Sequence, residues 1–188
     1  KAIQLITDSQ SRNPLGAWRY SPESKDADTT VSGAQMVALF AARNAGLGVP
    51  EEAIQKGLKF FQRCQTGEGG YGYTSAAGAN GPRTAIGTLV LALAKEKDTD
   101  SFRNAFTYLQ RAPRSNSYYQ YFLYYASQAF FHAGPKYWNE WNRNNIIELG
   151  KSQNGDGSWD GQFGATFCTA SSLLSLALNY RFLPIYER

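Results

Sequence analysis

Two aspartates are the clearest candidates for chemistry in this sequence. They lie in the segment KDADTTVSG, residues 25–33, directly before a stretch of small and apolar residues that predicts a buried helix. A carboxylate in this position can transfer a proton, or it can cap the helix by accepting hydrogen bonds from free backbone N–H groups of the first turn. Capping by Asp28 or Thr29 is the simpler interpretation, and Asp26 and Asp28 both remain candidate site residues.

A band of aromatic residues is the second candidate. The segment YYQYFLYYASQAFF, residues 118–131, predicts a helix that carries many rings. Rings on a buried helix most often serve packing, but they can also line a cavity, where their faces stabilise a cation and their hydroxyl groups reach water. The residues that we expect to line such a cavity are Tyr118, Tyr119, Tyr121, Tyr124 and Tyr125.

The sequence predicts no metal site and no cofactor. His132 is the single histidine, and Cys64 and Cys168 stand far apart, so no paired ligand motif is present. The two cysteines lie in apolar surroundings, which indicates buried thiols rather than a disulfide framework. The glycine-rich segment GEGGYGY follows a predicted helix and not a strand, so it lacks the context of a phosphate-binding loop.

Composition narrows the classes of function further. The chain has 188 residues, of which 43% are apolar and 18% charged, as in a single globular domain with a sizeable core. The net charge is +4, and the basic residues are scattered rather than clustered, which argues against nucleic-acid binding. No apolar run is long enough to span a membrane, and no signal peptide is visible, so the cellular compartment stays open.

The elements that position these residues repeat along the chain. A glutamine followed by a turn occurs at Gln10, Gln65, Gln110 and Gln153, spaced 55, 45 and 43 residues apart. Such spacings are typical of helical pairs or propeller blades. Before each glutamine, apolar residues recur with the period of a surface helix, and after each turn follows a segment that is apolar or small nearly all round. We therefore predict an all-α fold.

The expected architecture has about four pairs, each with an outer amphipathic helix and an inner buried one. The four repeats cover residues 1–47, 48–97, 98–134 and 135–188 of one domain. In three of them the glutamine ends the outer helix, and an aromatic residue (Trp18, Tyr71 or Trp159) folds back over that end. Buried amide and indole groups can satisfy the backbone groups that helix ends leave unpaired. The third copy, with Gln110, is degenerate.

These residues resemble the QW repeat of squalene–hopene and oxidosqualene cyclases, which belongs to the wider prenyltransferase/squalene-oxidase repeat class. The best matches are KGLKFFQRCQTGEGGYGY (56–73) and LGKSQNGDGSW (149–159), and the ending YRFLPIYER resembles bacterial proteins of this class. The resemblance implies an α/α toroid. A complete toroid contains more pairs than this chain, which implies that the sequence is the C-terminal part of a longer array.

The resemblance also implies two competing functions. In class II cyclases the central acid of an Asp-x-Asp-Asp motif protonates an alkene; here Asp26 and Asp28 match its first two aspartates and Asp28 takes the place of the acid. Thr29 stands where the last aspartate would be, so the catalytic motif is incomplete. Our leading expectation is a binding or scaffolding module for a hydrophobic small molecule, a glycan or another part of the parent protein. The alternative is a cyclase-like enzyme that acts on a polyprenyl substrate.

The predicted inner helix of the N-terminal repeat carries apolar residues that need a partner. No pair precedes its inner helix in this sequence, and Val31, Val37, Leu39 and Phe40 offer no polar face. Exposed apolar patches usually mark association surfaces. We therefore expect these four side chains to be exposed, and the chain either to close a small ring or to self-associate through its N-terminal repeat.

Overall fold

The computed structural model describes residues 1–114 and 118–181. In these two ranges the chain forms eight α-helices and one short 3₁₀ helix, with no strand, so the prediction of an all-α fold is confirmed. The helices are α1 (Ala2–Ser11), α2 (Thr29–Asn44), α3 (Glu51–Cys64), α4 (Gly81–Leu93), α5 (Asp100–Arg111), α6 (Tyr119–Ala133), α7 (Pro135–Ser152) and α8 (Ala165–Ala177), followed by the 3₁₀ helix at Leu178–Tyr180.

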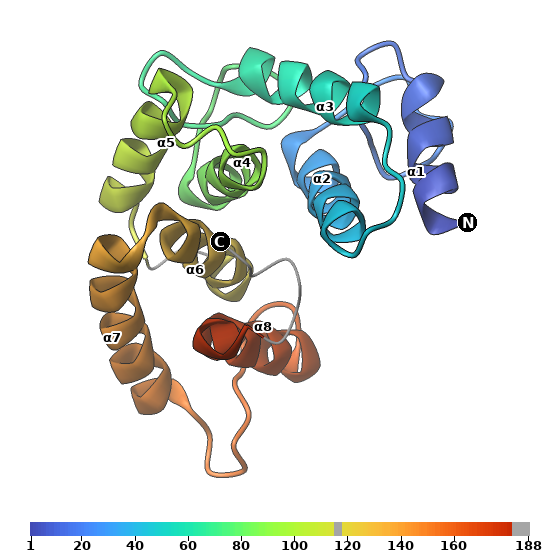
Figure 1. Cartoon of the computed structure of the whole chain (residues 1–188). Coiled ribbons are helices and arrows are strands. Elements are labelled where there is room, and N and C mark those ends of the chain that lie inside the picture. The colour runs from blue at the N-terminus through green and yellow to red at the C-terminus, as the bar shows by residue number, and fades with distance from the viewer. Residues whose placement is uncertain (115–117, 182–188) are drawn as a thin grey trace.

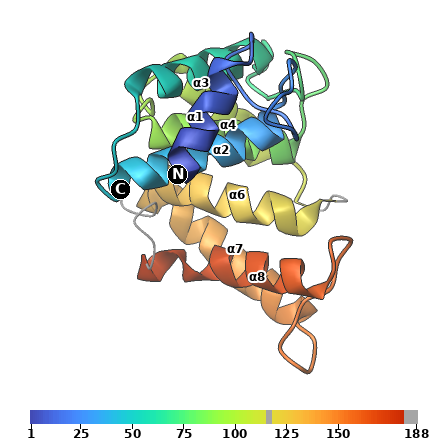
Figure 2. The same ribbon diagram turned by 90° about the vertical axis from the view of Figure 1, so that its right-hand side faces the viewer.

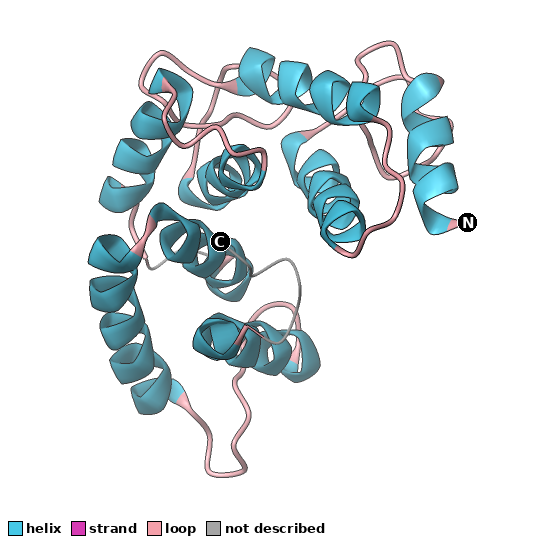
Figure 3. Cartoon of the chain, in the orientation of Figure 1, coloured by secondary structure: helices cyan, strands magenta, loops and turns pink. Residues whose placement is uncertain are grey.

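The helices form two rows that curve together. Figure 1 shows α1, α3, α5 and α7 along the outside and α2, α4, α6 and α8 along the inside. Neighbouring inner helices pack in chain order, α2 with α4, α4 with α6 and α6 with α8. The result is an arc that is open between α2 and α8 (Figure 1), and Figure 3 shows only loops between the helices.

Outer helices are buried on one face only, as their amphipathic sequences predict. In α5 the side chains of Phe102, Phe106 and Leu109 are buried on one face, while the intervening polar residues are exposed. Thr99 caps this helix, because its hydroxyl oxygen accepts a hydrogen bond from the backbone N–H of Phe102 at 3.2 Å. The face of apolar residues turns inward, so outer helices cover the inner ones.

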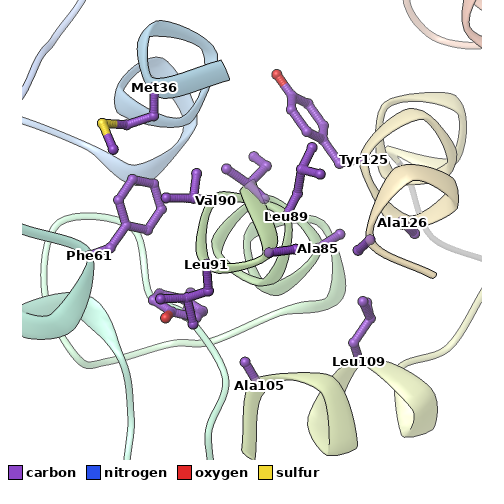
Figure 4. Close-up of a cluster of buried hydrophobic side chains, with 14 of the residues drawn as sticks. Met36, Phe61, Ala85, Leu89, Val90, Leu91, Ala105, Leu109, Tyr125 and Ala126 are labelled. Carbon is purple, nitrogen blue, oxygen red and sulfur yellow. The ribbon is translucent and has the colours of Figure 1, made fainter. Parts of the chain in front are cut away.

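The inner helix α4 lies at the centre of the core. Nearly all its residues are buried, and its neighbours α2, α3, α5 and α6 surround it. Figure 4 shows side chains from these helices converging on it, including Met36 of α2, Phe61 of α3, Leu109 of α5 and Tyr125 of α6. Close approach depends on small residues, since a Cβ atom at Gly87 would run into the ring of Tyr71.

We call the glutamine at the end of an outer helix, together with the aromatic residue after the following loop, a staple. In the first staple the Gln10 amide nitrogen donates to the carbonyl oxygens of Gly16 and Ala53, each at 2.8 Å. Gly16 lies in the same loop, whereas Ala53 belongs to the next outer helix, α3. The Trp18 indole N–H donates back to the carbonyl oxygen of Ile6 at 2.8 Å. One staple therefore ties a loop, its own outer helix and the next one.

The second staple repeats this arrangement one pair further on. The Gln65 amide nitrogen donates to the Gly69 carbonyl at 3.1 Å and to the Ser101 carbonyl of α5 at 2.9 Å. Its amide oxygen accepts from the Ser101 hydroxyl at 2.6 Å. Tyr71 is fully buried, but its hydroxyl group has no hydrogen-bond partner of good geometry among the described residues.

The aromatic residue of each staple is also fixed through its backbone. Its N–H donates to a hydroxyl oxygen on the inner helix that follows, at 3.0 Å in all three cases. The pairs are Trp18 with Ser32, Tyr71 with Thr84, and Trp159 with Thr169. Each inner helix is thus tied to its staple close to its first turn.

The third junction, between α5 and α6, has no staple. Gln110 is exposed, and its amide makes no hydrogen bond to the described residues. Arg114 ties this loop to the next outer helix instead: its Nε lies 2.9 Å from a carboxylate oxygen of Glu148, and its guanidinium lies 4.2 Å from the ring centroid of Trp141. The degenerate sequence of this copy corresponds to a different way of joining two pairs.

The expected exposed patch on the N-terminal inner helix is not found. Leu39 and Phe40 are buried and Val31 and Val37 are half-buried, because α1, α3 and α4 cover more of α2 than the sequence suggested. The expectation that all four side chains are exposed was wrong. Leu5 of α1 and Leu47 after α2 are exposed at this end. More of the large exposed apolar side chains lie at the other end of the arc, on α7 and α8: Ile146, Ile147, Phe167, Leu173 and Leu174.

Candidate functional site

The main candidate site is a pocket on the concave side of the arc. Figure 2 shows the loops that lead into α2 and α8 gathered at one side of the molecule. The pocket opens there, among the first turns of the four inner helices, and its volume is about 680 Å³, within the range of small-molecule sites. Seven aromatic rings dominate its lining: Tyr20, Tyr73, Tyr118, Tyr121, Tyr125, Phe163 and Phe167.

The fold brings these rings together from all four repeats. Tyr121 and Tyr125 lie on one face of α6, with ring centroids 5.1 Å apart. Phe163, in the loop before α8, meets Tyr118 at 5.9 Å and Tyr121 at 6.4 Å. Because every inner helix begins at the same side, residues near the start of each one can share one pocket.

Three of the five tyrosines expected to line a cavity do so. Tyr118, Tyr121 and Tyr125 line the pocket, and their spacing places them on one face of a helix. Tyr119 and Tyr124 do not line it, so these two assignments were wrong. The Tyr119 hydroxyl lies 3.4 Å from Glu148 on the outer side, and Tyr124 packs edge-on against the Tyr125 ring at 4.9 Å.

Sequence reasoning missed Tyr20 and Tyr73, which form the opposite wall. Each follows its staple aromatic by two residues, as in Trp18-x-Tyr20 and Tyr71-x-Tyr73. This shared spacing was a usable signal, because the staple fixes the backbone before it and so aims the next side chain. The two hydroxyl groups lie 3.3 Å apart.

Basic side chains stand at the same wall. The Arg19 guanidinium lies 5.4 Å from the Tyr20 ring centroid and 5.0 Å from that of Tyr73. The guanidinium of Arg83, which lines the pocket, lies 5.5 Å from the Tyr73 ring centroid. Among the residues that the structure describes, no acidic side chain lines this pocket, whereas Thr30, Asn80 and Arg83 contribute polar groups. The lining is therefore aromatic, with a few polar groups and one positive charge.

Three tyrosines of the pocket, Tyr73, Tyr121 and Tyr125, have raised pKa values and stay neutral far above neutral pH. Burial raises the pKa of Tyr121 to about 12 and that of Tyr73 also to about 12. Burial raises the pKa of Tyr125 further still, and the neighbouring Tyr121 and Tyr124 add to the effect. Neutral hydroxyl groups can donate as well as accept hydrogen bonds, so the walls offer a ligand both functions.

Asp28 lies outside this lining and caps α2. Its side chain is fully buried, and one carboxylate oxygen accepts hydrogen bonds from the backbone N–H groups of Thr30 at 2.8 Å and Val31 at 2.9 Å. The other oxygen accepts from the Arg19 guanidinium at 3.0 Å. Each of these donors points at a carboxylate oxygen of Asp28 and stabilises its negative charge. None of these contacts directs a proton toward the pocket.

Asp26 and Thr29, on either side of Asp28, make contacts of different kinds. The Asp26 carboxylate lies 3.3 Å from Arg19 Nε, and its side chain is 65% exposed. The Thr29 hydroxyl donates to the Gly72 carbonyl at 2.8 Å, and its backbone N–H donates to the Tyr73 carbonyl at 2.9 Å. Thr29 therefore joins the first repeat to the second.

Other kinds of site are absent from the parts of the chain that the structure describes. Residues 1–114 and 118–181 contain no cluster of three or more histidine, cysteine, aspartate or glutamate side chains arranged to hold a metal ion. Within the same ranges no helix has the length and apolar character that crossing a membrane requires. Cys64 and Cys168 are free and buried. His132 is also buried, in the last turn of α6.

Comparison with known proteins adds no assignment. No protein-family model matches the chain, and no curated protein matches it significantly.

Proposed function

We propose that this chain is a helical-repeat module that binds a ligand in the aromatic pocket of its concave side. The observation that carries the proposal is the lining itself: seven rings from four repeats surround about 680 Å³ of open space. Rings left exposed in a concave site offer a ligand apolar contact that solvent cannot provide. The ligand class that this lining favours is a hydrophobic small molecule.

A glycan is the second candidate ligand, and a separate observation favours it. Tyr20 and Tyr118 at the rim are 75% and 49% exposed, and Asn80 and Arg83 stand beside them. Rigid aromatic faces next to hydrogen-bonding groups suit a ligand that has both apolar faces and hydroxyl groups. Another segment of a longer parent protein could occupy the same place.

The position of Asp28 favours a binding role over a cyclase-like reaction. A general acid must hold a proton and direct it at the substrate. Asp28 instead receives hydrogen bonds from two backbone N–H groups and a guanidinium, away from the pocket lining. These contacts support the interpretation of Asp28 as a structural cap and of this chain as a module without its own acid.

Titration with two probes tests the proposal: an environment-sensitive hydrophobic dye and a neutral linear oligosaccharide. The matched variants are Tyr20→Ala in the pocket and Tyr180→Ala outside it, since these tyrosines are 75% and 71% exposed. We expect Tyr20→Ala to weaken binding of the preferred probe at least about fivefold, as loss of an aromatic anchor does. We expect Tyr180→Ala to leave it unchanged.

Each outcome has a definite meaning. Binding of the dye alone favours the hydrophobic ligand, and binding of the oligosaccharide alone favours the glycan. If neither probe binds, or if the two variants reduce binding equally, the pocket is not the binding site and the proposal fails.

A further inference from the structure

The staple formed by Gln153 and Trp159, after α7, is incomplete on one side. Gln10 and Gln65 each donate to a loop glycine and to a carbonyl in the first turn of the next outer helix. Among the described residues the Gln153 amide nitrogen donates to its loop glycine alone, the Gly157 carbonyl, at 2.9 Å. The Trp159 indole still donates to the Leu149 carbonyl at 3.0 Å, so the staple itself is formed. No described outer helix lies on its far side.

The loop glycines show the same difference. A Cβ atom at Gly16 would lie 3.1 Å from the Cβ of Lys56 on α3, and one at Gly69 would run into the backbone of Asn104 on α5. These loops therefore touch the next outer helix. A Cβ atom at Gly157 would meet only Gln153 of its own loop, at 3.9 Å. The same place in the repeat is filled twice and empty the third time.

Two exposed apolar residues at this end differ from the interior repeats. Ile147, six residues before its staple glutamine, is 48% exposed, whereas the corresponding residues of the first two repeats, Gln4 and Lys59, are exposed and polar. On α8, Leu173 stands four residues after Thr169 and is 52% exposed. The corresponding residues of α2 and α4 are Met36 and Thr88.

Met36 and Thr88 show what covers this position in the interior repeats. Both are fully buried, and Met36 packs against Gly57 of the next outer helix. Within the described ranges no outer helix covers Leu173 in this way. We call the surface formed by Ile147, Gln153, Gly157 and Leu173 the trailing edge. In the interior repeats the positions of Gln153, Gly157 and Leu173 contact the following pair. The partner that fits the trailing edge is therefore an outer and inner helical pair of this same repeat.

The first pair, α1 and α2, carries an exposed apolar residue of its own. Leu5 of α1 is 58% exposed, although the residues at the same distance from the glutamine in α3 and α5, Phe60 and Ala105, are buried. Charges of opposite sign also stand on the two surfaces. Lys1, directly before α1, lies nine residues before Gln10, as Lys56 lies nine residues before Gln65. On the other surface the exposed Asp156 precedes Gly157.

We propose that the trailing edge of one copy binds the α1–α2 pair of a second copy, head to tail. The Gln153 amide then donates to the start of the second copy's α1, and Leu173 and Ile147 are covered. Such a heterologous contact produces a closed ring if its rotation closes and an open chain of copies if it does not. This surface does not overlap the aromatic pocket, so the inference does not depend on the proposed ligand.

Light scattering of the purified chain over about 1 µM to 1 mM tests the contact, a range that brackets weak and moderate association. We expect the mean mass to rise above the 20.8 kDa of one copy. The double variant Ile147→Lys with Leu173→Thr installs the residues that interior repeats carry at these positions. It should therefore keep the fold while weakening association at least about tenfold. The pocket variant Tyr20→Ala serves as the control and should not change association.

Cysteine cross-linking distinguishes the geometry of the contact. Copies with Lys1→Cys mixed with copies with Asp156→Cys should form a covalent dimer on oxidation, because the native Cys64 and Cys168 are buried. A constant mass of one copy at every concentration would overturn the proposal. Association that the double variant leaves unchanged would overturn it as well, as would cross-linking of Asp156→Cys copies with one another alone.

Discussion

The second and third junctions of the array both connect consecutive outer helices, but they do so through different contacts. At the second junction, Gln65 ties its loop to the next outer helix through backbone carbonyls, and Tyr71 fills the space beneath. At the third, Gln110 is exposed and Arg114 reaches Glu148 and Trp141 of the next outer helix. What the repeat requires is a tie between consecutive outer helices, and the glutamine is one way to provide it.

The largest expected effect concerns the aromatic member of a staple. Trp159 is 4% exposed, so Trp159→Ala should lower the free energy of unfolding by about 3 kcal/mol through loss of a buried ring. Tyr118, which follows the loop of the third junction, is 49% exposed, and Tyr118→Ala should cost less than about 1 kcal/mol. Urea unfolding of both variants measures the difference. Equal losses would contradict the distinction between a junction with a staple and the third junction, which has none.

The close packing beneath the second staple should be nearly as sensitive. Gly87→Ala forces a methyl group into the Tyr71 ring, and we expect a loss of about 1–3 kcal/mol from overpacking. Gly150→Ala in α7 is the matched control, because no atom lies near the new methyl group there. That substitution should stabilise the helix slightly, by about 0.5 kcal/mol. Thermal unfolding of the pair reports both signs.

Removing the glutamines compares the two junctions directly. Gln65→Ala leaves the carbonyl oxygens of Gly69 and Ser101 without their donor and should cost about 1–2 kcal/mol. Gln110→Ala removes an exposed side chain and should change the free energy of unfolding by less than about 0.5 kcal/mol. A loss at Gln110 that matches the loss at Gln65 would show that the third junction uses its glutamine after all.

The tie at the third junction should be worth less than a staple. Arg114→Ala removes an ion pair and a contact with the Trp141 ring, and we expect a loss of about 1 kcal/mol. A double-mutant cycle with Glu148→Ala isolates the ion pair, whose coupling should be about 0.5 kcal/mol and should fall as salt is added. Coupling that does not depend on salt would contradict an electrostatic tie.

The smallest expected effect sharpens the comparison among the staples themselves. The Tyr71 hydroxyl is buried without a partner of good geometry, whereas Trp159 donates its indole N–H to Leu149. Tyr71→Phe should therefore be neutral or stabilise the protein by up to about 1 kcal/mol. Trp159→Phe should destabilise it, because the Leu149 carbonyl loses its donor. Chemical unfolding of the two variants should give changes of opposite sign or one change near zero.

Periodicity made the scaffold predictable. The spacing of the glutamines and the apolar faces of the helices before them were sufficient to expect an all-α chain of outer and inner helices. The helical period would also have separated the tyrosines of α6, because Tyr118, Tyr121 and Tyr125 share a face that Tyr119 and Tyr124 do not. That assignment failed because all five rings were treated as equivalent.

The pocket was harder to predict because half of its wall comes from loops. Tyr20 and Phe163 lie outside any helical period, and only the assembled arc brings them opposite α6. The cap at Asp28 followed from its position before a helix, but its ion pair with Arg19 depends on the path of the intervening loop. The exposure of the C-terminal edge was missed for the same reason, since it depends on which neighbours are present.

The staples also determine how this molecule should come apart. Each links its own pair to the next, so adjacent pairs lend one another stability and the chain resembles a one-dimensional cooperative array. α4 has neighbours on both sides and should show the slowest amide hydrogen exchange, close to that of global unfolding. The last pair, α7 and α8, has a neighbour on one side only, so in a single copy its amides should exchange through fraying from that end.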